Sequence, residues 1–92
     1  MNHRVVWRKR VRNRLGTVLF IAREQGRDTS PIQRAVREIG RRLADAPATE
    51  GESRDGSERV LIVGPLAVFF EVFAVRQTVL IYSAVSYPRQ RL

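Results

Sequence analysis

The residues of this sequence with the most evident capacity to bind a charged ligand are its arginines. Sixteen of its seventeen basic side chains are Arg, there are nine acidic ones, and the formal net charge is +8. Residues 1–43 carry twelve basic and three acidic side chains (+9), whereas residues 44–92 carry five and six (−1). A guanidinium group matches both phosphate and carboxylate. The first half of the chain is therefore either a solvated basic surface or a surface that binds nucleic acid or an acidic protein.

One carboxylate stands out because its neighbours are apolar. Glu71 follows Phe70 and precedes Val72 in a segment of strand type. Burial of an unpaired charge is costly, so this side chain must reach solvent or meet a cation such as Arg59 or Arg54. Three roles stay open for Glu71, namely a structural ion pair, a contact with a partner, and a general base.

Metal and thiol chemistry is not expected. The chain has no cysteine, and its one histidine is His3, so neither a disulfide framework nor a thiolate or histidine metal site is available. No cofactor is expected either. The longest apolar run, residues 61–70, is interrupted by Gly64-Pro65 and is far shorter than the roughly 20 residues that span a bilayer. With no signal-peptide pattern after the basic N-terminus, we expect a cytoplasmic protein.

The elements that must position these side chains centre on the C-terminal part of the chain. Residues 59–63, 67–74 and 78–85 are rich in Val, Ile, Leu, Phe and Tyr, and they are separated by Gly64-Pro65 and Arg76-Gln77. Reversals this short cannot hold a crossover helix, so the pattern predicts an antiparallel three-stranded meander. In the middle strand, apolar residues occupy both odd-numbered and even-numbered positions, so they point to both faces of the sheet. The pattern therefore predicts that both faces need cover.

The N-terminal half supplies a short strand and two helices. Residues 3–7 are of strand type and should add to the meander. The apolar spacing of residues 11–22 predicts a helix from about residue 8 to 25, with Gly26 at its C-terminal cap. Ser30-Pro31 predicts the start of a second helix, with Ser30 as N-cap and Gln33 returning a hydrogen bond, and Ala46-Pro47 ends it. Residues 48–57 are polar and turn-forming, as in a flexible connection.

This order predicts a single α+β domain over residues 1–92. Its topology is βααβββ, a helical hairpin packed on an antiparallel sheet with a C-terminal three-stranded meander.

The pattern from residue 50 onward resembles the RelE/ParE superfamily of type II toxins. The residues that carry the resemblance are Glu50-Gly51-Glu52-Ser53-Arg54, the run Arg59–Val72 (RVLIVGPLAVFFEV) and the strand Val79-Leu80-Ile81. The resemblance covers nearly the whole chain in element order and implies a plasmid-stabilisation-like toxin neutralised by a cognate antitoxin. One branch of the superfamily cleaves messenger RNA on the ribosome and another inhibits DNA gyrase, so both targets stay open.

If the chain is an enzyme, the resemblance implies an endoribonuclease. In such a reaction the 2′-hydroxyl attacks the adjacent phosphate, a base takes its proton, cations stabilise the phosphorane and an acid protonates the leaving oxygen. The side chains that could occupy catalytic positions are Arg54, Arg59, Arg76 and Tyr87, with Glu71 as a base by its chemistry alone. Residues expected to contact the antitoxin are Phe69, Phe73 and Arg89.

Two further interpretations remain. The chain could have the toxin fold without its activity, or it could be a general nucleic-acid-binding domain that uses its arginine-rich helices. An antitoxin segment with apolar and acidic residues would dock across the sheet and beside the helices. An apolar sheet surface left uncovered would also favour homo-oligomers.

Overall fold

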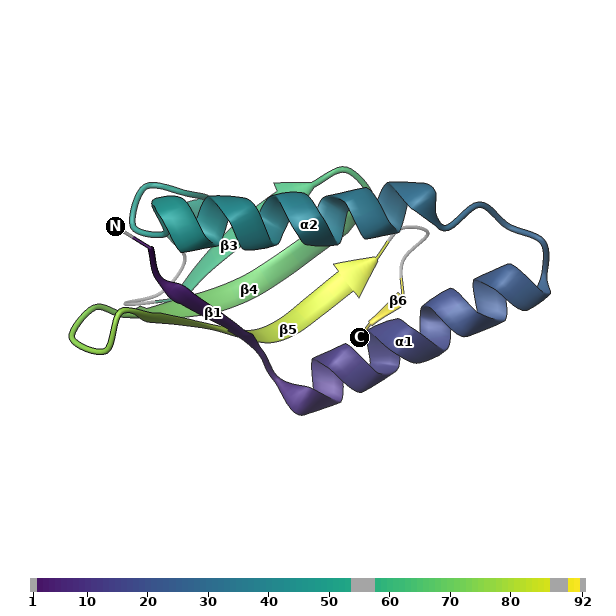
Figure 1. Cartoon of the computed structure of the whole chain (residues 1–92), viewed down its shortest axis with the longest axis horizontal. Helices are drawn as coiled ribbons and strands as arrows, with labels where there is room; N and C mark the ends of the chain where they lie inside the picture. The colour runs from purple at the N-terminus through teal and green to yellow at the C-terminus, as the bar shows by residue number, and fades with distance from the viewer. Residues whose placement is uncertain (1, 54–57, 87–89, 92) are drawn as a thin grey trace.

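The computed structural model describes residues 2–53, 58–86 and 90–91. The predicted α+β class and the order βααβββ are confirmed, and two very short strands are added to them (Figure 1). The elements are β1 (Arg4–Trp7), α1 (Lys9–Glu24), α2 (Ser30–Asp45), β2 (Glu52–Ser53), β3 (Glu58–Val63), β4 (Leu66–Phe73), β5 (Thr78–Ser86) and β6 (Gln90–Arg91).

The strands form one mixed sheet in the order β1-β5-β4-β3-β2, with β6 paired to the end of β5. Strands β3, β4 and β5 make the predicted antiparallel meander. The N-terminal strand joins this meander, as expected, and it runs parallel to β5, with Arg4 opposite Thr78 and Trp7 opposite Ile81. A parallel neighbour is possible because both helices separate β1 from the rest of the sheet along the chain.

The two reversals of the meander have clear local causes. Between β3 and β4, Gly64 adopts a φ of 54°, which glycine tolerates, and the restricted φ of Pro65 follows it. Between β4 and β5 the chain turns over residues 74–77, and Gln77 takes a φ of 48°. The Gln77 amide donates to the carbonyl of Ala74 at 3.1 Å and closes this turn.

Helix α1 ends as its sequence predicts. Gly26 has a φ of 72°, its amide donates to Arg23, and the Arg27 amide donates to Ala22. This pair of bonds is a Schellman motif, which satisfies carbonyls that the helix leaves free.

The predicted start of α2 is off by one residue. Thr29, not Ser30, is the N-cap, and its side chain makes no capping bond to the backbone. Instead, the Asp28 carboxylate accepts from the Ser30 amide at 2.9 Å, and Gln33 Nε2 donates to Thr29 Oγ1 at 3.3 Å. The free amide is thus satisfied by the stronger acceptor two residues earlier, since a carboxylate outcompetes a hydroxyl.

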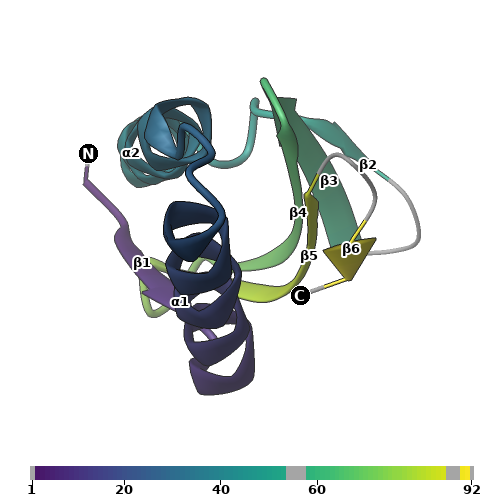
Figure 2. The ribbon, with the colours of Figure 1, turned by 90° about the vertical axis from the view of Figure 1, so that its right-hand side faces the viewer.

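Both helices pack on one side of the curved sheet (Figure 2). The core joins residues from α1 and α2 to alternate residues of the strands, and its largest fully buried members include Phe70, Ile39, Leu43, Leu66 and Ile81. Helix α2 contacts β1, β3, β4 and β5, whereas α1 contacts β5. No helix in the described part of the chain is long and apolar enough to cross a membrane.

A β-bulge sets which side chains of β5 face the helices. Phe70 pairs with Ile81 while Phe69 pairs with Ser83, so Tyr82 is an extra residue on β5. Beyond the bulge, the inward alternation passes from Val79 and Ile81 to Ala84 and Ser86, all of which are buried. Because of the bulge, the residues of β5 that follow Tyr82 lie on the opposite face from the one that strict alternation would give them.

The expectation of cover on both faces is only half met. Neither helix lies on the second face of the sheet, although β4 contributes apolar side chains to it. Phe73 on this face is 41% exposed and Ile62 is 62% exposed. This second face is called the open face below.

Candidate functional site

The open face is the most distinctive surface of the sheet. The pairing registers place one row of Arg4, Thr78 and Phe73 across β1, β5 and β4. The next row along the strands has Val6, Leu80, Glu71 and Glu58. Further rows contain Ser83, Phe69, Val60, Val85, Ala67 and Ile62. The face is therefore mainly apolar, with charged side chains toward the β4–β5 turn.

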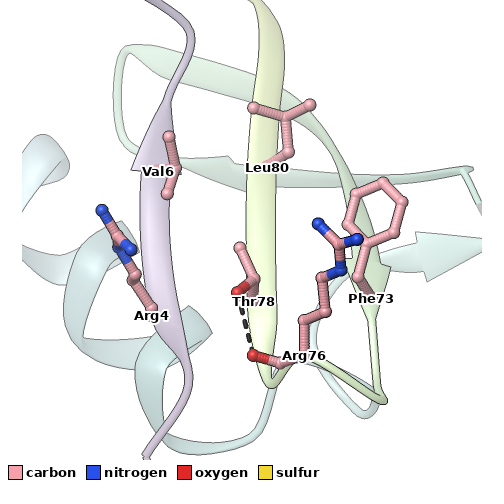
Figure 3. A pocket seen from close by; sticks show the side chains of 6 residues that line it. All are labelled: Arg4, Val6, Phe73, Arg76, Thr78 and Leu80. Atoms are coloured by element: carbon pink, nitrogen blue, oxygen red, sulfur yellow. Dashed lines mark hydrogen bonds between the residues drawn. The ribbon is translucent and has the colours of Figure 1, made fainter.

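A cleft of about 850 Å³ lies on the open face at this end of the sheet. It is lined by Arg4, Val6, Phe73, Arg76, Thr78 and Leu80 (Figure 3). Arg4 comes from β1 on one side of β5, while Phe73 and Arg76 lie on the other side. The N-terminal strand and the β4–β5 hairpin thus meet at the cleft because β1 pairs with β5.

The β4–β5 turn positions the second arginine of the cleft. The Thr78 hydroxyl donates to the main-chain carbonyl of Arg76 at 3.0 Å, which ties the turn to the start of β5. The left-handed backbone at Gln77 then directs the chain back into the sheet. Both arginine side chains are exposed, so their guanidinium groups can reach a ligand at the mouth of the cleft.

The chemistry of the cleft suits binding. Its floor is apolar, and its two guanidinium groups carry fixed positive charge with donors arranged for a carboxylate or a phosphate. None of the six lining side chains can act as a general base near neutral pH, because a guanidinium does not lose its proton. Glu71 is the carboxylate nearest in register, since it lies opposite Leu80. The arrangement fits a ligand that has both apolar and anionic groups.

Two of the predicted catalytic arginines lie on opposite faces of the sheet. Arg59 pairs with Phe70, so its side chain belongs to the face that the helices cover, whereas Arg76 lines the cleft on the open face. Arg59 is half-buried, and it donates from Nε to the Glu50 carbonyl at 3.0 Å and from Nη2 to the Gly51 carbonyl at 3.2 Å. Its guanidinium therefore holds the segment after α2 against β3.

The other predicted site residues divide into three groups. Phe69, Glu71 and Phe73 all lie on the open face, where Phe69 and Glu71 are half-buried and Phe73 is exposed. Glu71 stands opposite Glu58 of β3, so the two carboxylates share one row. Arg54, Tyr87 and Arg89 lie outside the described residues.

Sequence reasoning missed four residues of the cleft, namely Arg4, Val6, Thr78 and Leu80. Their shared signal is their position in the sheet. Arg4 lies opposite Thr78 and Val6 lies opposite Leu80, so all four side chains belong to one face. That signal becomes readable only when the parallel register of β1 on β5 is known. No group of three or more His, Cys, Asp or Glu side chains that could hold a metal ion occurs among the described residues.

Comparison with known proteins gives no match. None of the protein-family models, curated proteins or solved structures compared with the chain matches it. The order of elements, with two helices that precede the main strands of a small sheet, is compatible with the RelE/ParE fold. Function must therefore be argued from the surfaces of the molecule.

Proposed function

We propose that this chain is the toxin component of a type II toxin–antitoxin pair and that a cognate antitoxin neutralises it. The observation that carries the proposal is the open face of the sheet, an apolar surface that the chain's own helices leave uncovered in a βααβββ arrangement. Apolar surface that is contiguous and exposed favours association with a partner. The resemblance in element order to RelE/ParE toxins gives that partner its class.

Charge narrows the chemistry of the partner. The cleft on the open face is lined by two arginines and Phe73, and the whole chain has a formal net charge of +8. A docked antitoxin segment should therefore carry an apolar side chain for the floor of the cleft and a carboxylate for Arg4 and Arg76. A segment that lacks the carboxylate would leave two cations partly desolvated and unpaired, which lowers affinity.

The experiment that tests the proposal is induced expression of the chain alone in a bacterial host, with growth and total RNA followed in the same culture. Growth arrest supports the toxin. Cleaved messages then identify an endoribonuclease, and intact messages point to gyrase. Normal growth at full expression of folded protein contradicts a toxin active in that host and favours the inactive toxin fold or the nucleic-acid-binding domain.

The antitoxin is tested by co-expression of the small open reading frame adjacent to this one in its genome. Restored growth and a co-purifying complex support the pair. The double variant Arg4→Glu and Arg76→Glu should weaken the rescue, because both changes place carboxylates against an acidic segment. The double variant Arg34→Glu and Arg37→Glu, at two exposed positions of α2, is the control matched for charge and should leave the rescue unchanged. Equal rescue of both variants would contradict docking at the cleft.

A further inference from the structure

A second surface, separate from the open face, is the basic start of α1. Five of the seven residues from 8 to 14 are basic, and all five are exposed. They are Arg8, Lys9, Arg10, Arg12 and Arg14, called the basic cluster of α1 below. The cluster lies on the covered side of the sheet, and the apolar stripe of the helix beneath it, with Val11 and Leu15, is buried in the core.

The placement of these cations works against the stability of the helix. The first turn of a helix carries partial positive charge, yet α1 has no acidic residue there, and its N-cap Arg8 makes no side-chain capping bond. Two pairs at helical spacing of four, Arg8 with Arg12 and Arg10 with Arg14, repel one another. A local arrangement that opposes folding at several points is typical of a surface kept for function.

The charges of the cluster are also not neutralised within the described part of the chain. On α2, by contrast, Glu38 pairs with Arg41 at 2.7 Å and with Arg42 at 3.1 Å. The structure gives no such ion pair to any of the five cations on α1 among the described residues. The positive charge of the cluster is therefore available to a partner.

The cations surround the outer side of the helix. At 100° per residue, Arg12 lies on one flank of the buried stripe, and Arg10 and Arg14 lie on the other, while Arg8 is the N-cap at the start of the helix. Lys9 and Asn13 lie between the flanks, on the side away from the sheet, and both are exposed. A partner that receives this side of α1 must present negative charge along both flanks.

The density of charge distinguishes between polyanions. Six residue steps at 1.5 Å give about 9 Å of helix for the five cations. A nucleic-acid duplex carries one negative charge per roughly 1.7 Å of axis, or about five in the same length. An extended acidic peptide offers at most one carboxylate per roughly 3.3 Å, which is about three. A helix of about 10–12 Å diameter also matches the roughly 12 Å width of a B-form major groove.

We propose that the basic cluster of α1 binds the phosphate backbones of a nucleic-acid duplex, with one arginine flank toward each strand of a groove. Contacts of this kind fix position and carry no sequence information, so binding should be independent of sequence. A membrane surface fits less well, because the apolar stripe beneath the cluster is committed to the core and is not free to insert. The inference does not depend on toxin activity, since it is measured on the purified protein.

The test compares two triple variants of equal net charge. Arg10→Gln, Arg12→Gln and Arg14→Gln remove three cations of the cluster, and the control removes three exposed cations elsewhere through Arg27→Gln, Arg34→Gln and Arg37→Gln. Gln has nearly the helix propensity of Arg, so backbone preference is unchanged. Binding of fluorescent 20-base-pair DNA duplexes of two unrelated sequences is followed by anisotropy over a range of salt concentrations.

The cluster variant is expected to lose at least about 100-fold in affinity at 0.1 M salt, and its slope of log affinity against log salt should fall by about 2 to 3. The control should lose less than about 5-fold. Because repulsion at the start of α1 is relieved, the melting temperature of the cluster variant should rise by about 3 °C or more. Loss of binding together with a gain in stability is a result that a merely structural role would not produce.

Several results would overturn the inference. Equal losses in the two triple variants would mean that net charge alone determines binding. Equal affinity for the single strand, full competition by polyglutamate, or binding to phosphatidylserine vesicles without binding to duplex would each exclude a duplex site. A lower melting temperature in the cluster variant would assign these arginines to the fold. Parallel titrations with duplex RNA show whether the protein prefers DNA or RNA. A preference for DNA is expected, because the major groove of an A-form duplex is too narrow for a helix.

Discussion

Replacement of Arg59 by alanine is expected to lower the free energy of unfolding by about 2 kcal/mol. The Arg59 guanidinium makes two charge-assisted hydrogen bonds, to the carbonyls of Glu50 at 3.0 Å and Gly51 at 3.2 Å. Each such bond contributes about 1 kcal/mol net, which is below the roughly 1.5 to 3 kcal/mol typical of bonds to charged groups because the donor is only half-buried. For a domain of this size, the loss corresponds to a fall of roughly 10 °C in melting temperature.

Thermal and urea unfolding followed by circular dichroism measure this change. Arg76→Ala is the matched control, because Arg76 is exposed in a turn and its hydrogen bond to Thr78 uses the main chain. It should change stability by less than about 0.5 kcal/mol. Arg59→Lys should fall between the two, since one ammonium cannot reproduce the paired geometry of the guanidinium. An Arg59→Ala protein as stable as the parent would refute a structural role for this side chain.

Other predictions concern glycines and a carboxylate. Gly51→Ala should destabilise the fold by more than about 2 kcal/mol in a urea titration, because a Cβ there would overlap the carbonyl oxygen of Val60. Gly26→Ala is its control. Gly26 has a φ of 72°, close to the 69° of Gly51, but open space around it, so this change should cost about 1 kcal/mol. Gly16→Ala should stabilise α1 by about 0.5 to 1 kcal/mol, because its Cβ meets no atom within 4 Å; a lower melting temperature would contradict this. The hydrogen bonds from Ser30 hold the pKa of Asp28 below its ordinary value of 3.8. The folded state therefore gains stability from the Asp28 carboxylate above this pH and loses it as the pH falls through the lowered pKa, a dependence that Asp28→Asn should remove from an acid titration of stability.

Local patterns were sufficient for much of the fold. The meander follows from short reversals, and the observed turn at Gly64-Pro65 needs only the properties of those two residues. The cap at Gly26 and the apolar stripes of both helices depend on neighbours within a few positions. Even the one-residue error at Ser30 has a local origin, because the Asp28 carboxylate accepts from the Ser30 amide and the helix already begins at Ser30.

The site residues required information that no local pattern contains. Arg59 and Arg76 are both arginines near strand ends, and their sequence contexts do not show that one holds a loop while the other lines a cleft. Their separation follows from strand register, which assigns each side chain to one face. Arg4 enters the cleft only because its strand pairs with a partner more than seventy residues later.

The sequence alone therefore determined the order and type of the main elements, the C-terminal cap of α1, the turns and the uneven distribution of charge, because each of these depends on residue type and short spacing. Only the tertiary structure decided the parallel pairing of β1 with β5, the bulge at Tyr82 and the face that stays uncovered. These features arise from contacts between segments distant in sequence, where the packing of the core selects one register among several that the strands could adopt. The open face and its cleft are the result of that selection.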